Sequence, residues 1–141
     1  MKIWNGYGSE HSANLVIIGK FASASDAQNN LGFLNEVIEV AQRDYDSGEL
    51  QNSIQKNEIS EGIMELYRRT QLLLGSTDAE QLLYDFNAKQ EGDKIVITTN
   101  ELEINAVLKV LLHGSAKIEV YSAHDHDSAY GRQTSLVTKN L

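Results

Sequence analysis

Cysteine and proline are both missing from this chain of 141 residues. Without cysteine the chain can form neither disulfide bonds nor thiolate metal sites, and it has no cysteine nucleophile. Long apolar runs are missing too, because a run such as Leu15-Val16-Ile17-Ile18 is far shorter than the roughly 20 residues that cross a membrane. The first residues also lack the basic-then-apolar profile of a secretory signal. We therefore expect a cytoplasmic protein, and the length predicts a single domain over residues 1–141.

Acidic residues are in excess, and they are concentrated in the middle of the chain. The net charge is −8. Residues 1–20 contribute +1 (two Lys, one Glu), residues 21–80 contribute −7 (eleven acids, four bases) and residues 81–141 contribute −2 (eight acids, six bases). Such a surface repels phosphate backbones, which argues against direct nucleic-acid binding, and it attracts a basic protein. The alternative is a solvated helical face whose charge only keeps the protein soluble.

The spacing of apolar residues predicts the order strand, helix, strand, strand, helix, strand. The strands are recognised by β-branched runs or by alternation with polar residues, and they are expected at 14–21, 84–89, 94–99 and 117–123. The two helices are expected at 25–46 and 101–113. Ser25 with Gln28, and Asn100 with Glu103, have the spacing of helix N-terminal capping pairs.

This order is that of the ferredoxin-like split βαβ sandwich, an antiparallel four-stranded sheet with helices on one face. Residues at about 49–80 would then form a helical insertion before the hairpin. Within it we expect a loop or frayed helix at 49–58 and a helix at 60–74. In the ferredoxin-like arrangement the first and last strands are antiparallel neighbours, so the beginning of one lies beside the end of the other.

That pairing would gather one glutamate and three histidines at an edge of the sheet: Glu10, His11, His124 and His126. His124 and His126 point to the same side if the strand continues that far. Two imidazoles with a third imidazole or a carboxylate can bind zinc or another first-row divalent metal. The simpler interpretation is a polar, solvent-exposed strand end whose histidines bind nothing.

Two function classes follow, and neither involves a membrane. The first, which we favour, is a non-enzymatic acidic protein-binding module, such as an inhibitor or immunity-type protein that neutralises a basic toxin or nuclease. Its candidate partner-binding residues are Glu36, Glu39, Asp44 and Glu65. The alternative is a small metal-dependent enzyme or ligand-binding protein that uses the Glu/His cluster. An uncovered sheet face would also favour a homodimer.

Overall fold

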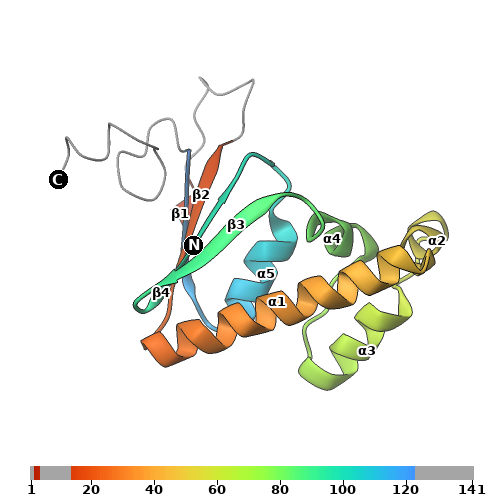
Figure 1. The fold of residues 1–141 in the computed structure, drawn as a ribbon, viewed down its shortest axis with the longest axis horizontal. Coiled ribbons are helices and arrows are strands. Elements are labelled where there is room, and N and C mark those ends of the chain that lie inside the picture. Colours follow the sequence, from red (N-terminus) through yellow and green to blue (C-terminus); the bar gives the residue numbers. More distant parts are fainter. Residues whose placement is uncertain (1, 4–13, 123–141) are drawn as a thin grey trace.

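The computed structural model describes residues 2–3 and 14–122, which form a sheet covered on one face by helices (Figure 1). The strands of this part of the chain are β1 (Lys2–Ile3), β2 (Leu15–Lys20), β3 (Phe86–Glu91), β4 (Lys94–Thr99) and β5 (Lys117–Ser122). Its helices are α1 (Ala24–Asp46), α2 (Glu49–Gln55), α3 (Glu61–Thr70), α4 (Ser76–Gln81) and α5 (Asn105–His113). None of the helices in these ranges is long and apolar enough to cross a membrane. The predicted α+β class is confirmed.

The sheet has the order β1-β5-β2-β4-β3, and its four longer strands are antiparallel to their neighbours. The predicted pairing of the first and last long strands is confirmed, with Leu15 opposite Ser122 and Lys20 opposite Lys117. The sequence analysis did not predict β1, which lies parallel to β5 at the edge of the sheet. A strand of two residues has no periodicity, so its pattern could not reveal it.

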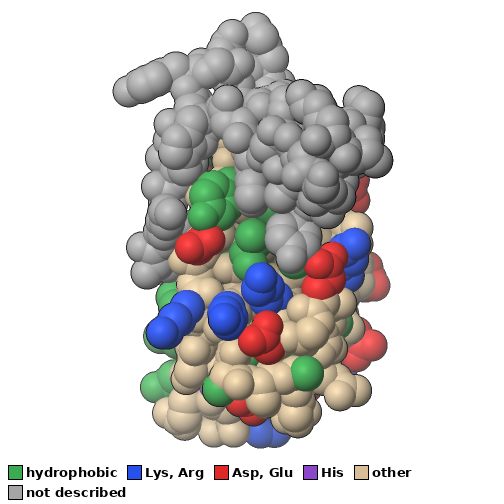
Figure 2. Space-filling view, turned by 90° about the vertical axis from the view of Figure 1, so that its left-hand side faces the viewer, with side chains coloured by type: hydrophobic (Ala, Val, Ile, Leu, Met, Phe, Trp, Pro, Cys, Tyr) green, Lys and Arg blue, Asp and Glu red, His purple; other side chains and the backbone are tan. Residues whose placement is uncertain are grey.

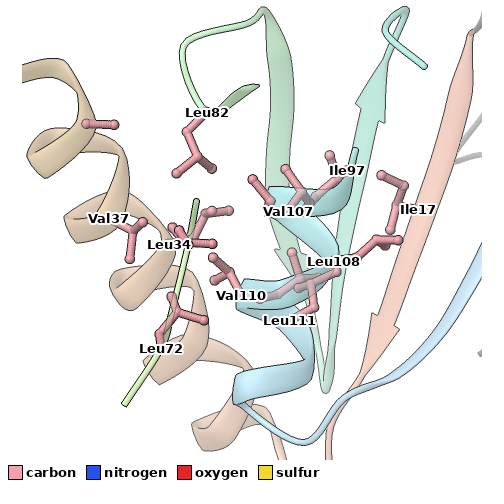
Figure 3. Packing of buried hydrophobic residues seen from close by; sticks show 14 of the residues in the cluster. Ile17, Leu34, Val37, Leu72, Leu82, Ile97, Val107, Leu108, Val110 and Leu111 are labelled. Carbon is pink, nitrogen blue, oxygen red and sulfur yellow. The ribbon is translucent and has the colours of Figure 1, made fainter. Parts of the chain in front are cut away.

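The hydrophobic core lies between the sheet and the helices. Side chains of α5 fill the space between α1 and the sheet, so that Val110 packs toward Leu34 of α1 while Val107 packs toward Ile97 (Figure 3). Gly19 of β2 permits this close packing, because an added Cβ atom would lie 3.3 Å from Leu111 Cδ2. A larger residue at position 19 would push α5 away from the sheet.

The start of α1 differs from the prediction by one residue. The N-cap is Ser23 and not Ser25, and Ser23 Oγ accepts a hydrogen bond from the Asp26 backbone N–H at 3.1 Å. Each of these serines is followed three residues later by a polar side chain, so the sequence contained two plausible capping positions. The helix starts at the first of them.

The helical insertion predicted at about 49–80 contains α2, α3 and α4. The helix expected at 60–74 is shorter, because α3 ends at Thr70 and Gln71 follows in the left-handed conformation. The segment 49–58, for which a loop or frayed helix was expected, contains the regular helix α2. Leu50 and Ser53 are its buried residues, which is too few to produce a clear helical period. Asp44 near the end of α1 connects the insertion to that helix, since its Oδ2 accepts hydrogen bonds from Ser60 Oγ at 2.5 Å and Gly62 N at 3.0 Å.

Candidate functional site

A hollow open to solvent lies at the end of the sheet where β2 begins and β4 ends. With its open mouth it measures about 230 Å³, and apolar side chains of the sheet and of α5 form much of its wall. The lining residues are Ile17, Gln81, Tyr84, Phe86, Ile97, Thr99, Glu101, Glu103, Ile104 and Val107. The space inside it that water-sized groups can occupy is about that of one water molecule. The hollow is therefore a shallow contact point for the end of a side chain and does not enclose a small-molecule ligand.

Tyr84 lines this hollow close to carboxylates. Its hydroxyl donates a hydrogen bond to Glu103 Oε1 at 3.3 Å. Burial raises the pKa of the Tyr84 hydroxyl, and it is raised further by the charge and hydrogen bond of Glu103 and by the charges of Glu80 and Glu101. The phenol is therefore protonated at neutral pH, and the same carboxylates make the potential around it negative.

Glu101 and Glu103 line the hollow from the non-helical segment that precedes α5. The helix begins later than predicted. Asn100 does not cap a helix over 101–113, since the N-cap is Ile104 and the helix begins at Asn105. A distant side chain replaces the local cap: Gln81 Oε1 accepts a hydrogen bond from the Ala106 backbone N–H at 3.0 Å. Because Gln81 accepts the hydrogen bond of a backbone N–H in the first turn of α5, the helix needs no cap from residues 100–103. The segment that carries both glutamates therefore stays non-helical.

The buried carboxylate of Asp78 fixes α4, the helix that carries Gln81, against α5. Asp78 Oδ2 lies 2.5 Å from Lys109 Nζ and accepts a hydrogen bond from Gly75 N at 3.0 Å. Asp78 is only 9% exposed, and these two partners offset the cost of burying its carboxylate. The wall of the hollow therefore rests on a charged contact inside the helical layer.

The four acids predicted to bind a partner lie on α1 and α3, and their contacts differ. Glu36 Oε2 is 2.6 Å from Arg69 Nη2 and Glu65 Oε2 is 4.0 Å from Arg69 Nε, so one guanidinium serves both acids. Asp44 is half-buried and holds the beginning of α3, as described above. Glu39 is exposed and forms no ion pair or side-chain hydrogen bond with the residues that the structure describes.

The predicted metal ligands Glu10, His11, His124 and His126 lie outside the described residues. Within residues 2–3 and 14–122, no group of three or more histidine and acidic side chains is arranged to hold a metal ion. The described strands do contain the pairing from which the metal site was predicted, because the start of β2 lies opposite the end of β5.

The sequence analysis missed Tyr84 and Glu101 as site residues, although the predicted hairpin contained a signal. Phe86 lies opposite Thr99 in the antiparallel register of β3 and β4. Tyr84 precedes Phe86 by two residues and Glu101 follows Thr99 by two. Residues at equal distances beyond a paired position can meet where the strands end, so the hairpin register would have brought these two side chains together.

A model of one protein family matches residues 1–132, which include every element of the described fold. The chain belongs to the DUF6375 family. This is a family of unknown function. No curated protein and no solved structure matches the chain. Membership in DUF6375 thus brings no ligand or reaction with it, and the function must be argued from the residues.

The hollow of this DUF6375 chain combines apolar walls with a negatively charged mouth. A lysine or arginine side chain has the complementary form, with an apolar stem and a charged head. The ring of Tyr84 adds a surface that attracts cations. The arrangement can bind a basic side chain.

Proposed function

We propose that this protein is a non-enzymatic acidic binding module that holds a basic protein, such as a toxin or nuclease that it neutralises. A lysine or arginine of the partner would enter the hollow. The observation that supports this best is that Glu101 and Glu103 line a small hollow with apolar walls. Basic and aromatic anchors in such pockets contribute most of the binding energy in many interfaces.

The acids of α1 and α3 have a different part in this proposal. A net charge of −8 attracts a cationic protein over a distance and speeds its association. Glu39 contributes to this attraction fully, whereas Glu36 and Glu65 share the positive charge of Arg69. We expect these acids to affect the association rate and its salt dependence, and the hollow to affect the dissociation rate.

The hollow can be tested without knowing the partner, by titrating the protein with N-acetyl-arginine amide. This probe carries the side chain in question, and N-acetyl-glutamine amide is the uncharged control. We expect backbone NMR shifts to change around Tyr84, Thr99 and Val107 with the arginine probe only. Glu101→Gln/Glu103→Gln should weaken the effect by about tenfold, which corresponds to about 1.4 kcal/mol.

A matched variant separates the hollow from the overall charge. Glu39→Gln/Asp46→Asn removes two negative charges from exposed positions on α1 and should leave the titration nearly unchanged. Equal weakening by both double variants would mean that the probe responds only to net charge. In affinity purification from the native host, the wild-type protein should retain a basic protein that Glu101→Gln/Glu103→Gln releases faster.

The same proposal includes a fold assignment and a location. We propose that β2, β3, β4 and β5, together with α1 and α5, form a ferredoxin-like split βαβ unit with α2, α3 and α4 inserted. The order β5-β2-β4-β3 with antiparallel neighbours supports this assignment. A crystal structure in which β4 does not lie between β2 and β3 would contradict it. The lack of cysteine is compatible with work in the cytoplasm.

A second candidate is a small metal-dependent enzyme or ligand-binding protein that uses Glu10, His11, His124 and His126. The pairing of β2 with β5 favours it, because the two segments that carry these residues adjoin the paired strand ends. Calorimetry near pH 7.5 should then detect zinc binding that is lost by about pH 5, as the imidazoles take up protons. His126→Ala should weaken it at least about tenfold.

The control for this candidate is His113→Ala. His113 ends α5, and its Nε2 lies 2.8 Å from the Thr70 backbone oxygen, so it is already engaged elsewhere. Its replacement should leave zinc binding unchanged. A wild-type protein that takes up no zinc would remove the second candidate and leave the first unaffected.

A further inference from the structure

Three lysines lie side by side on the sheet face that points away from the helices. Lys20 of β2 is opposite Lys94 of β4 on one side and opposite Lys117 of β5 on the other. Neighbouring strands are about 4.8 Å apart, so the three positions span about 10 Å. Figure 2 shows Lys and Arg side chains gathered on this face. These three residues are termed the lysine row.

The two exposed lysines of the row, Lys20 and Lys117, carry positive charges at directly opposed positions. No carboxylate of the described residues pairs with either. Glu91 lies opposite Lys94, and its Oε2 is 3.1 Å from Lys89 Nζ. Like charges directly opposite each other destabilise a sheet, so Lys20 and Lys117 repel each other.

The row matches a linear series of carboxylates. Side chains three or four residues apart on a helix are about 5–6 Å apart, close to the separation of neighbouring strands. Lysine ammonium groups attract carboxylates as point charges. The spacing therefore suits glutamate or aspartate at one-turn intervals on a helix.

Nucleic acid fits the same face less well. Single-stranded nucleic acids bind where aromatic rings provide stacking surfaces beside basic groups. Tyr121 of β5 is on this face, but it lies opposite Val16, whereas Lys117 at the other end of β5 lies opposite Lys20. The ring is therefore not beside the lysine row, where a stacking surface would be needed.

We propose that the lysine row docks an acidic helical segment of another protein, with carboxylates spaced by one helical turn. The row lies at the end of the sheet where β2 finishes, whereas the hollow lies where β2 begins. The two surfaces are separate and opposite in charge. This inference does not depend on the function proposed for the hollow.

Fluorescence anisotropy tests the proposal with a labelled helical peptide of about five turns that carries Glu at three successive i, i+4 positions. At about 50 mM salt we expect the peptide to bind and the same peptide with Gln in place of Glu not to bind. Lys20→Gln/Lys117→Gln should weaken binding by about tenfold or more. Arg43→Gln/Lys56→Gln removes two positive charges from exposed positions on α1 and just after α2 and should change the binding little.

Thermal unfolding supplies a second readout. Removal of two repelling charges should raise the Tm of Lys20→Gln/Lys117→Gln by about 1–4 °C, whereas a row that supports the fold would lower it when neutralised. Equal binding of the Glu and Gln peptides, or unchanged binding by the lysine variant, would overturn the proposal. So would tighter binding of a single-stranded DNA oligonucleotide, or a concentration-dependent dimer that the lysine variant abolishes, which would assign the row to nucleic acid or to a second copy.

Discussion

The surfaces near the two ends of β2 carry opposite charges, and different structural features hold their charged residues in place. Where β2 begins, Glu101 and Glu103 line a hollow whose wall depends on helix packing, through the cap from Gln81 and the buried Asp78. Where β2 finishes, the lysine row depends on strand register alone. The acidic surface should therefore be sensitive to changes in the helices behind it. The basic surface should respond only to replacement of the lysines themselves.

In the helical layer, several acidic side chains form ion pairs with arginines of the same layer. Residues 21–80 contribute −7 to the net charge, yet several of their acids have internal partners. Arg68 pairs with Glu61 at 3.5 Å, and Arg69 contacts two further acids. Exposed pairs of this kind stabilise a protein by about 0–1 kcal/mol each. A charge count along the sequence thus overstates how much of this layer is available to a partner.

The largest effect on the acidic end should come from Asp78→Ala. The substitution leaves Gly75 N and Lys109 Nζ without their carboxylate and loosens α4 from α5. Removing one member of a buried pair costs about 3–5 kcal/mol, but the Lys109 side chain is 45% exposed and can remain hydrated. We expect a loss of about 2 kcal/mol in the free energy of unfolding, measured by urea denaturation.

The control is Glu80→Ala on the same helix, where no ion pair or side-chain hydrogen bond within the described residues is removed. Its cost should stay within about 0.5 kcal/mol. If Asp78→Ala were as mild as this control, the acidic end would not depend on helix packing. The contrast with the lysine row would then fail.

An intermediate effect is expected from Asp44→Ala, with Glu39→Ala as its matched control on α1. Asp44 acts as a cap for α3, since it accepts a hydrogen bond from the Gly62 backbone N–H. Loss of such a cap costs about 1–2 kcal/mol, whereas an exposed acid without a partner costs within about 0.5 kcal/mol. Urea denaturation of both variants measures the difference. Equal stabilities would mean that the cap from Asp44 does not stabilise α3, and Asp44 would then be available to bind a partner.

The sequence predicted the strands well because their periodicity is local. The strand expected at 94–99 has those bounds in the structure, and the strand expected at 117–123 ends one residue earlier. The strand expected at 84–89 lies two residues later, at Phe86–Glu91. Pairing of the first and last long strands also followed, because the element order leaves few arrangements open. The helical segment at 49–55 was missed for the opposite reason, since it buries too few side chains to show a period.

The candidate site could be predicted only in part, because long-range caps decide its form. Gln81 caps α5 from 25 residues away and Asp44 caps α3 from 18 residues away. A search for capping residues considers only the few positions before a helix, so it selected Asn100 and placed Glu103 inside the helix. The acids Glu36 and Glu65 were correctly seen as charged, but their shared contact with Arg69 depends on how α1 and α3 pack.

The smallest effect tests the charge at the acidic end directly, through Tyr84→Phe. At neutral pH the lost hydrogen bond from the Tyr84 hydroxyl to Glu103 should cost less than about 1 kcal/mol, because its length is 3.3 Å and its carboxylate partner is exposed.

The pH dependence of Tyr84→Phe is more informative. Folding raises the pKa of the Tyr84 hydroxyl above its ordinary value of 10.0, so the folded state holds this proton more tightly than the unfolded state. The resulting stability is fully present below about pH 10 and is lost as the pH rises through the folded-state pKa. The wild-type protein should therefore lose stability relative to Tyr84→Phe as the pH rises above about 10, in urea denaturation at each pH. Parallel loss by both proteins would show that Glu80, Glu101 and Glu103 do not act on the phenol, and the acidic end would no longer differ in charge from its surroundings.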